Sequence, residues 1–245
     1  MKNLTNNRFW EIDILRGIGM LMVIIFHFFF DLNYFDIFNS AMYEGFWLIF
    51  QRIAASLLIL LVGISLNLRY ESAKKTSSGL LQKILKRGLS LAFIAGIITI
   101  ATWIYPNKGF IIFGIIHFIA LAVLLGYFFL RFFYLNLLFG FATIFIGLWM
   151  ESISTTSNLF FWLGLPSVGF YSLDYFPIFP WFGLVLIGIF LGKCFYPNNK
   201  RKLNLRFPQS KIVYILTWMG RNSLLLYLIH QPVLIVMMHI LIFIN

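Results

Sequence analysis

A chain of 245 residues in which 61% are hydrophobic and only 11% are charged is not a soluble globular domain, because such domains carry about 25% charged residues. The net charge of +11 does not indicate nucleic-acid binding, since the basic residues lie in short segments between apolar runs. The single cysteine, Cys194, excludes an internal disulfide and a thiolate metal cluster, and we expect no metal. The sequence therefore predicts an integral membrane protein.

Apolar runs of about 20 residues predict an all-α, polytopic bundle of about seven membrane-spanning helices. In chain order the predicted spans lie near 14–31, 46–66, 84–104, 110–130, 133–150, 178–196 and 222–243. The stretch 212–219 is too short to span and is expected at the membrane interface. No small-residue cleavage pattern follows the first run, so we expect it to be retained. Residues 1–245 are predicted to form a single transmembrane domain.

The distribution of basic residues predicts the orientation of the bundle, because Lys and Arg concentrate in cytoplasmic loops. With the N-terminus inside, 16 of the 19 basic residues fall in cytoplasmic segments, and the outer segments 32–45 and 151–177 contain none. The acidic residues at or beyond the outer face are Asp31, Asp36, Glu44, Glu151 and Asp174. We therefore expect a multi-pass plasma-membrane protein with its N-terminus inside and its C-terminus outside.

The first span, which contains "LRGIGMLMVIIFHFFFDL" (15–32), carries ionisable side chains on one helical stripe. Arg16 and His27 are almost three whole turns apart, Asp31 follows His27 by four residues, and Asp13 precedes Arg16 by three. At the helical rise, Arg16 lies about 16 Å below His27, near the cytoplasmic boundary. Since ionisable groups in a span usually face the bundle interior or a wet cavity, the stripe predicts a polar path through the membrane.

Later spans are expected to bring polar side chains to the same cavity. The predicted spans place His27, Arg52 and His117 at a common depth, about 10 Å below the outer surface. His230 lies deeper, and the outer segment "DYFPIFPW" adds two more candidates. The full set of predicted cavity residues beyond the first span is Arg52, His117, Asp174, Trp181 and His230.

Each candidate also has a structural interpretation. A histidine in a span is often a satisfied core residue, which is an alternative for His117 and His230. Arg16 at a helix start is also explained by binding to lipid phosphates. Asp31 would serve as an outer helix cap, and Arg52 would form an ion pair with Asp31 or Glu44.

The stripe indicates acyl transfer. A histidine oriented by a carboxylate, away from bulk water, is a general base for a hydroxyl or an amine, which predicts His27 as the base and Asp31 as its orienting group. A cytoplasmic guanidinium binds phosphate well, which predicts Arg16 and Arg87 as contacts of a phosphorylated donor such as acyl-CoA. No P-loop, HExxH, GxSxG or Rossmann glycine pattern offers another chemistry.

Five segments in order resemble one known family. They are "RFWEIDILRGIGMLMVIIFHFFFDL", "LLVGISLNLRY", "FGIIHFIAL", "DYFPIFPWFGLVLIGIFLGK" and "GRNSLLLYLIHQPVLI". They resemble the heparan-α-glucosaminide N-acetyltransferase catalytic-domain family, and the spacing of Arg16 and His27 is similar to the signature of type-3 transmembrane acyltransferases. The resemblance implies a helix bundle that moves an acyl group across the membrane to a glycan or lipid head group. The expected donor is acetyl-CoA or another acyl-CoA.

The resemblance has one departure at the expected base. Long lysosomal members of the family have asparagine at the position of His27 and their catalytic histidine where this chain has Phe38. The catalytic role of His27 therefore follows the type-3 pattern.

Two other classes of function remain open from the sequence. A proton-coupled carrier or flippase would also place His, Asp and Arg on facing helices near the midplane, although no internal repeat is visible. A non-enzymatic partner subunit would tolerate substitution of the polar stripe. We expect membrane lipids as partners and no binding of nucleic acid. The sequence also leaves open whether the protein forms a homo-oligomer.

Overall fold

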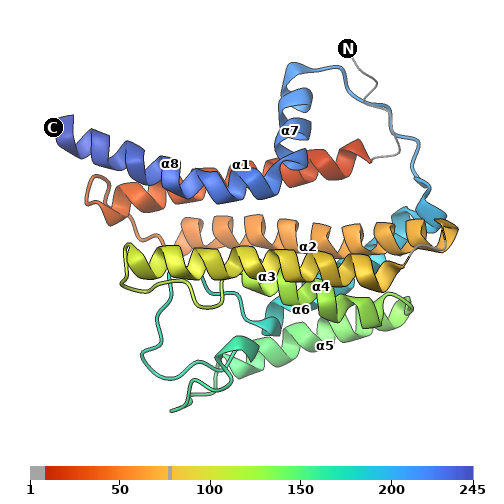
Figure 1. The fold of residues 1–245 in the computed structure, drawn as a ribbon, viewed down its shortest axis with the longest axis horizontal. Helices are drawn as coiled ribbons and strands as arrows, with labels where there is room; N and C mark the ends of the chain where they lie inside the picture. The colour runs from red at the N-terminus through yellow and green to blue at the C-terminus, as the bar shows by residue number, and fades with distance from the viewer. Residues whose placement is uncertain (1–8, 77–78, 245) are drawn as a thin grey trace. The chain divides into compact units, whose positions relative to one another are not determined.

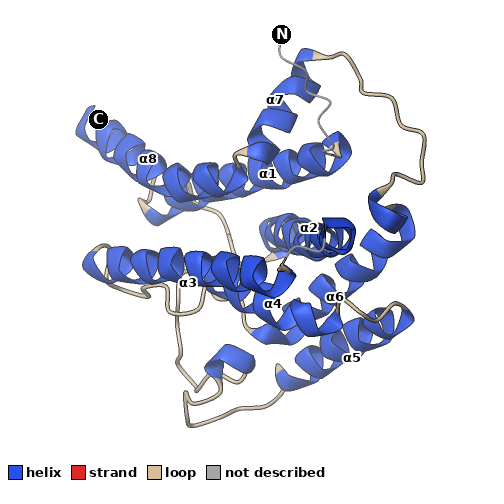
Figure 2. Ribbon diagram, turned by 45° about the vertical axis from the view of Figure 1, so that its right-hand side comes forward, coloured by secondary structure: helices blue, strands red, loops and turns tan. Residues whose placement is uncertain are grey.

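The computed structural model describes residues 9–76 and 79–244. Within these residues the chain is helical and contains no named strand (Figure 2). The α-helices are α1 (Trp10–Tyr34), α2 (Gly45–Thr76), α3 (Leu80–Ile104), α4 (Ile115–Phe129), α5 (Tyr134–Met150), α6 (Ile178–Phe195), α7 (Lys211–Arg221) and α8 (Ser223–Ile244). The predicted all-α class is confirmed.

Five of these helices are long and apolar enough to cross a membrane: α1, α2, α3, α6 and α8. Helices α4 and α5 are apolar but shorter, with 15 and 17 residues, so the count of seven spans stays a prediction. The fourth predicted span began too early, near 110. Residues 105–109 contain turns and 110–114 are not helical, and the Thr102 side chain at the end of α3 accepts a hydrogen bond from the Ile111 amide (3.0 Å).

The chain divides into two compact units, which we describe separately. The first unit contains Met1–Leu61 and Asn204–Asn245, and therefore α1, the first part of α2, α7 and α8. The second unit contains Val62–Leu203, and therefore the rest of α2 and helices α3 to α6. The expectation of a single domain stays a prediction.

In the first unit, α1 packs against α7 near its N-terminus and against α8 along its length (Figure 1). The α1–α7 contact is a close approach of two backbones. A Cβ atom at Gly17 would overlap the Leu216 carbonyl, and one at Gly220 would overlap the Asp13 carbonyl. Only glycine permits this distance at either position, so these two glycines fix where α7 crosses α1.

Helices α1 and α8 run in the same direction. Contacts between them advance together along both chains, from the His27–His230 pair to the Phe35–His239 pair, whose ring centroids lie 5.3 Å apart. Both helices therefore begin at the same side of the unit. The sequence likewise predicts that the first and seventh spans run in the same direction.

In the second unit, α5 and α6 are antiparallel and so are α3 and α4. Phe133 at the start of α5 stacks on Phe190 late in α6, with ring centroids 5.1 Å apart. Early in α3, Gly88 packs against Leu124 of α4. The corner between α4 and α5 is closed by the buried Asn136, whose amide donates to the carbonyls at the end of α4.

Candidate functional site

The first unit places two histidines in contact at the α1–α8 interface. The rings of His27 and His230 meet edge to face, with centroids 5.0 Å apart and an angle of 62° between planes. His230 is only 8% exposed. Neither His27 Nδ1 nor His230 Nε2 has a hydrogen-bond partner within the described residues, and both atoms are buried. Buried polar atoms are usually satisfied, so these two nitrogens require an explanation.

The tautomer of neutral His230 follows from its other nitrogen. Nδ1 lies 2.6 Å from the backbone carbonyl of Tyr227. A carbonyl oxygen can only accept, so Nδ1 carries the hydrogen and donates it. In the neutral ring, Nε2 then holds a lone pair. The unpaired Nε2 of His230 is therefore a basic nitrogen whose orientation is fixed by the helix backbone.

The predicted hydrogen bond from His27 to Asp31 is not present. The Asp31 carboxylate is 3% exposed and accepts instead from the Gln231 amide of α8, with Nε2 at 2.8 Å from Oδ1 and 3.1 Å from Oδ2. Asp31 lies one turn after His27 on α1, and Gln231 directly follows His230 on α8. Asp31 thus lies beside His27 on the stripe, as predicted, but its partner comes from another helix. A catalytic contribution of Asp31 stays a prediction.

Aromatic side chains surround His27 in the first unit. Its ring contacts Phe26 and Phe30, with centroids at 5.6 and 6.3 Å, and Phe26 in turn contacts Trp47 at the start of α2. His230 contacts Tyr227 at 5.4 Å. These rings exclude water from much of the pair, and this strengthens electrostatic interactions there.

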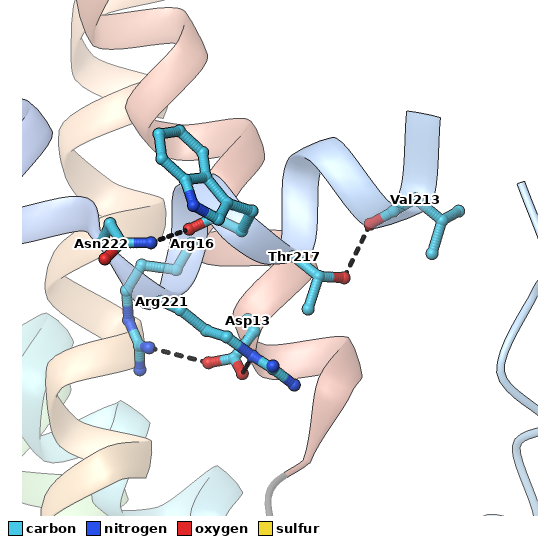
Figure 3. Close-up of polar contacts among 7 residues, drawn as sticks. Asp13, Arg16, Val213, Thr217, Arg221 and Asn222 are labelled. Atoms are coloured by element: carbon cyan, nitrogen blue, oxygen red, sulfur yellow. Dashed lines mark hydrogen bonds and ion pairs between the residues drawn. The ribbon is translucent and has the colours of Figure 1, made fainter. Parts of the chain in front are cut away.

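The N-terminal end of the stripe on α1 is an ion cluster (Figure 3). Asp13 is 3% exposed; its Oδ1 accepts from Arg16 at 3.1 Å and its Oδ2 from Arg221 of α7 at 3.2 Å. Figure 3 shows both guanidinium groups directed at this one carboxylate. Both guanidinium groups are partly exposed.

Arg52 lies on the part of α2 that belongs to the first unit, and its side chain is exposed. With Ser56 one turn later it lines a shallow groove that is otherwise apolar. Among the described residues of its unit it forms no ion pair, so the predicted pairing with Asp31 or Glu44 is not present. A place in a shared cavity stays a prediction.

His117 lies in the second unit, at the start of α4, and both of its nitrogens are bonded. Nδ1 accepts from the Gly114 amide at 3.3 Å, and Nε2 donates to the Thr99 hydroxyl at 3.0 Å. That hydroxyl has its own acceptor, the Ile111 carbonyl at 2.7 Å. These bonds join α3 to the turn before α4. They account for His117 as a structural residue, and its predicted place in a cavity with His27 and Arg52 stays untested.

Asp174 also holds the start of α4. Its Oδ2 accepts from the Ile115 amide at 2.9 Å, where an acidic group favours the N-terminal end of a helix. The neighbouring Tyr175 donates to the Phe161 carbonyl at 2.6 Å, and burial raises the pKa of its phenol to about 12. Trp181 on α6 contacts Phe176, with ring centroids 4.8 Å apart. We call Thr99, Gly114, His117 and Asp174 the outer clamp of the second unit, after the outer position that the sequence predicts for this end.

Arg87 lies in the second unit at the opposite end from the outer clamp. It is half-buried near the start of α3, and Arg69 on α2 is close enough to repel its charge. More basic residues gather at this end, where Lys74 pairs with Glu71 at 3.2 Å and lies over the Tyr70 ring. The end is therefore rich in positive charge, as the topology argument predicted.

Two residues that bind the polar stripe of α1 from other helices were not assigned a site role from the sequence. Gln231 and Arg221 are the partners of the two buried carboxylates of α1. Both stand in the quoted segment "GRNSLLLYLIHQPVLI", next to residues that drew attention for other reasons. Within the described residues, no group of three or more His, Cys, Asp or Glu side chains could hold a metal ion.

Comparison with known proteins gives one clear result. The family model for the catalytic domain of heparan-alpha-glucosaminide N-acetyltransferase matches residues 8–232. Comparisons with curated proteins and with solved structures gave no match. Since the matched region covers nearly the whole chain and contains both the histidine pair and the ion cluster, the protein belongs to this family of acetyltransferase catalytic domains.

Proposed function

We propose that this member of the family transfers an acetyl group from acetyl-CoA on the cytoplasmic side to a hydroxyl or amine on the outer side of the plasma membrane. The acceptor would be a glycan or a lipid head group. The observation that carries the proposal is the His27–His230 pair, two buried imidazoles in contact that each keep an unpaired nitrogen. An unpaired imidazole nitrogen in a dry site is suited to general-base catalysis.

In the proposed reaction His27 is the base. It takes the proton from the acceptor oxygen or nitrogen as that atom attacks the thioester carbon. The new bond forms to the acetyl carbon, the carbon–sulfur bond breaks, and the imidazolium returns its proton to the CoA sulfur. The products are the acetylated acceptor and free CoA, and His27 ends in its starting state.

The donor's phosphates are proposed to bind at the cytoplasmic ends of the helices. In the first unit, Arg16 and Arg221 share Asp13, and both guanidinium groups are partly exposed. A phosphate oxygen would accept charge-assisted hydrogen bonds from these guanidinium groups. In the second unit, Arg87 with its neighbour Arg69 is the candidate for phosphate contact.

The proposed orientation, with the N-terminus inside and the C-terminus outside, is supported within each unit. Helices α1 and α8 begin at the same side, where Arg16 and Arg221 lie. In the second unit Arg69, Lys74 and Arg87 lie opposite the outer clamp. A membrane protein retains such basic ends on the cytoplasmic side.

Sealed membrane vesicles test the function and its direction together. Inside-out vesicles receive acetyl-CoA with a radiolabelled acetyl group, and the label in lipid and glycan material is then measured. We expect transfer that depends on the protein and is lost with His27→Ala. Right-side-out vesicles, whose cytoplasmic face is closed to the donor, should show none. Equal labelling with and without the protein would overturn the proposal.

The same preparation in detergent separates the enzyme from the other candidate functions. Acetyl transfer to solubilised acceptor needs no gradient, whereas a proton-coupled carrier or flippase has no activity without a sealed membrane. Transport of substrate in vesicles, without any transfer in detergent, would favour the carrier.

A further inference from the structure

We propose that His230 is the positioning residue for His27, through a hydrogen bond from His27 Nδ1–H to His230 Nε2. Two hydrogen bonds in series would then fix the ring of the base from α8: His230 Nδ1–H donates to the Tyr227 carbonyl, and His27 Nδ1–H donates to His230 Nε2. The tautomeric pairing stands on the geometry alone, and only its effect on rate rests on the proposed acetyl transfer.

The two unpaired nitrogens carry this inference. Within the described residues, each ring of the contacting pair has one buried nitrogen without a partner, Nδ1 on His27 and Nε2 on His230. The two atoms are not hydrogen-bonded to each other in this structure, and one hydrogen bond between them, direct or through a single bridging water, would satisfy both. Leaving both without a partner would cost about 1–3 kcal/mol for each buried group.

The direction of the bond follows from the fixed ring. His230 donates through Nδ1 to the Tyr227 carbonyl, so in the neutral ring its Nε2 can only accept. His27 must then donate through Nδ1. A neutral His27 with its hydrogen on Nδ1 has its lone pair on Nε2, and that atom is left to face the acceptor. His230 would therefore select the reactive tautomer of His27.

This arrangement assigns to His230 the role that the sequence suggested for Asp31. Asp31 is occupied by the Gln231 amide, and His27 Nδ1 has no bond to it. A neutral imidazole is a weaker partner for an imidazolium than a carboxylate is, but it orients the ring equally well. When His27 takes the acceptor's proton on Nε2, its Nδ1–H continues to donate to His230. The proton leaves again from Nε2 to the CoA sulfur, so His230 undergoes no net change.

Histidine tautomers can be read directly by ¹⁵N NMR of the protein in lipid nanodiscs. The chain has only 4 histidines, and the His27 signals are identified by their loss in His27→Gln. We expect wild-type His27 to be protonated on Nδ1 and not on Nε2. In His230→Leu that preference should disappear, because no acceptor faces Nδ1. His230→Gln should retain it, because the amide oxygen can accept the same hydrogen.

His239 provides a matched control on the same helix. Its Nδ1 lies 2.8 Å from the Ile235 carbonyl and its ring contacts Phe35 of α1, but it is exposed and has no histidine neighbour on α1. His239→Leu should therefore leave the His27 tautomer and acetyl transfer unchanged. A similar change in His239→Leu and His230→Leu would mean that the effect comes from repacking of α8, and would contradict the proposal.

The kinetic result separates this inference from the proposed function. His230→Leu should lower kcat by roughly 10²-fold with little change in KM for acetyl-CoA, and His230→Gln should recover most of the loss. If wild-type protein transfers no acetyl group, the proposed function fails, and the NMR result still decides the pairing. Wild-type His27 protonated on Nε2 would overturn the pairing whether or not the His230 variants fold.

Discussion

The two units treat their buried histidines in opposite ways. In the outer clamp of the second unit, both nitrogens of His117 are bonded, and its hydroxyl partner Thr99 has an acceptor as well. In the first unit, His27 and His230 touch each other and keep unpaired nitrogens. A satisfied polar network holds structure together, whereas buried polar atoms left unpaired are characteristic of a place where a substrate or a proton is handled.

The largest expected difference between the units is in how much a histidine substitution lowers the rate of acetyl transfer. His27→Ala should lower acetyl transfer by about 10²- to 10⁴-fold, because it removes a general base, while the melting temperature changes little. His117→Ala should show the reverse pattern, with a lower melting temperature and nearly normal transfer per folded molecule. Transfer assays and thermal unfolding in the same nanodiscs measure both. Normal transfer by folded His27→Ala would show that the first-unit pair is structural.

A second effect should be confined to donor binding. Arg16→Ala is expected to raise KM for acetyl-CoA by roughly tenfold or more, because a charge-assisted hydrogen bond contributes about 1.5–3 kcal/mol. The fold should survive, since Arg221 still pairs with the buried Asp13. Lys75, which is exposed and bonds to a loop carbonyl of the second unit, provides the control. If Lys75→Ala raises KM as much as Arg16→Ala, the effect is one of general surface charge.

Much of the fold could be predicted from the sequence, because the length of an apolar run and the placement of Lys and Arg are strong signals in a membrane protein. The start of α4 was misplaced because residues 110–114 are apolar enough to belong to a span, yet they lie outside the helix, which begins at Ile115. Hydropathy does not detect such a boundary. The length of α2 was underestimated, since the charged residues after 66 are compatible with helix in water.

The site could be predicted only in part. The helical spacing predicted that Asp13, Arg16, His27 and Asp31 share one face of α1, and α1 is a continuous helix over these residues. His230 was named as a candidate from its expected depth in the last span. The spacing could not supply the partners, because hydrogen bonds between helices depend on how α8 is rotated against α1. Local spacing therefore favoured Asp31 as the partner of His27, and the packed helices bring His230 there instead.

The outer clamp should respond to loss of its acidic cap through stability alone. Asp174→Ala leaves the Ile115 amide at the start of α4 without its acceptor, and a lost cap typically costs about 1–2 kcal/mol. Transfer per folded molecule should stay within twofold, roughly, of wild type. Glu151→Ala, at the exposed end of α5, is the control and should have little effect on unfolding. A large fall in kcat at unchanged stability would place Asp174 in the reaction.

The smallest effect is expected for Asp31→Asn, and its size tests which residue orients His27. An asparagine oxygen can still accept from the Gln231 amide, and its new amide group can donate to Gln231 Oε1, which is buried and has no partner within the described residues. Stability should therefore be retained or slightly higher. Because His230 is proposed to fix the His27 ring, transfer should fall by less than about tenfold, well short of the loss expected for His27→Ala.

Asp31→Leu is the contrasting variant, since it leaves both polar ends of Gln231 unpaired and should lower the melting temperature. If Asp31→Asn instead abolishes transfer while the protein stays folded, the negative charge of Asp31 takes part in the reaction. The histidine pair would then not be sufficient to orient the base.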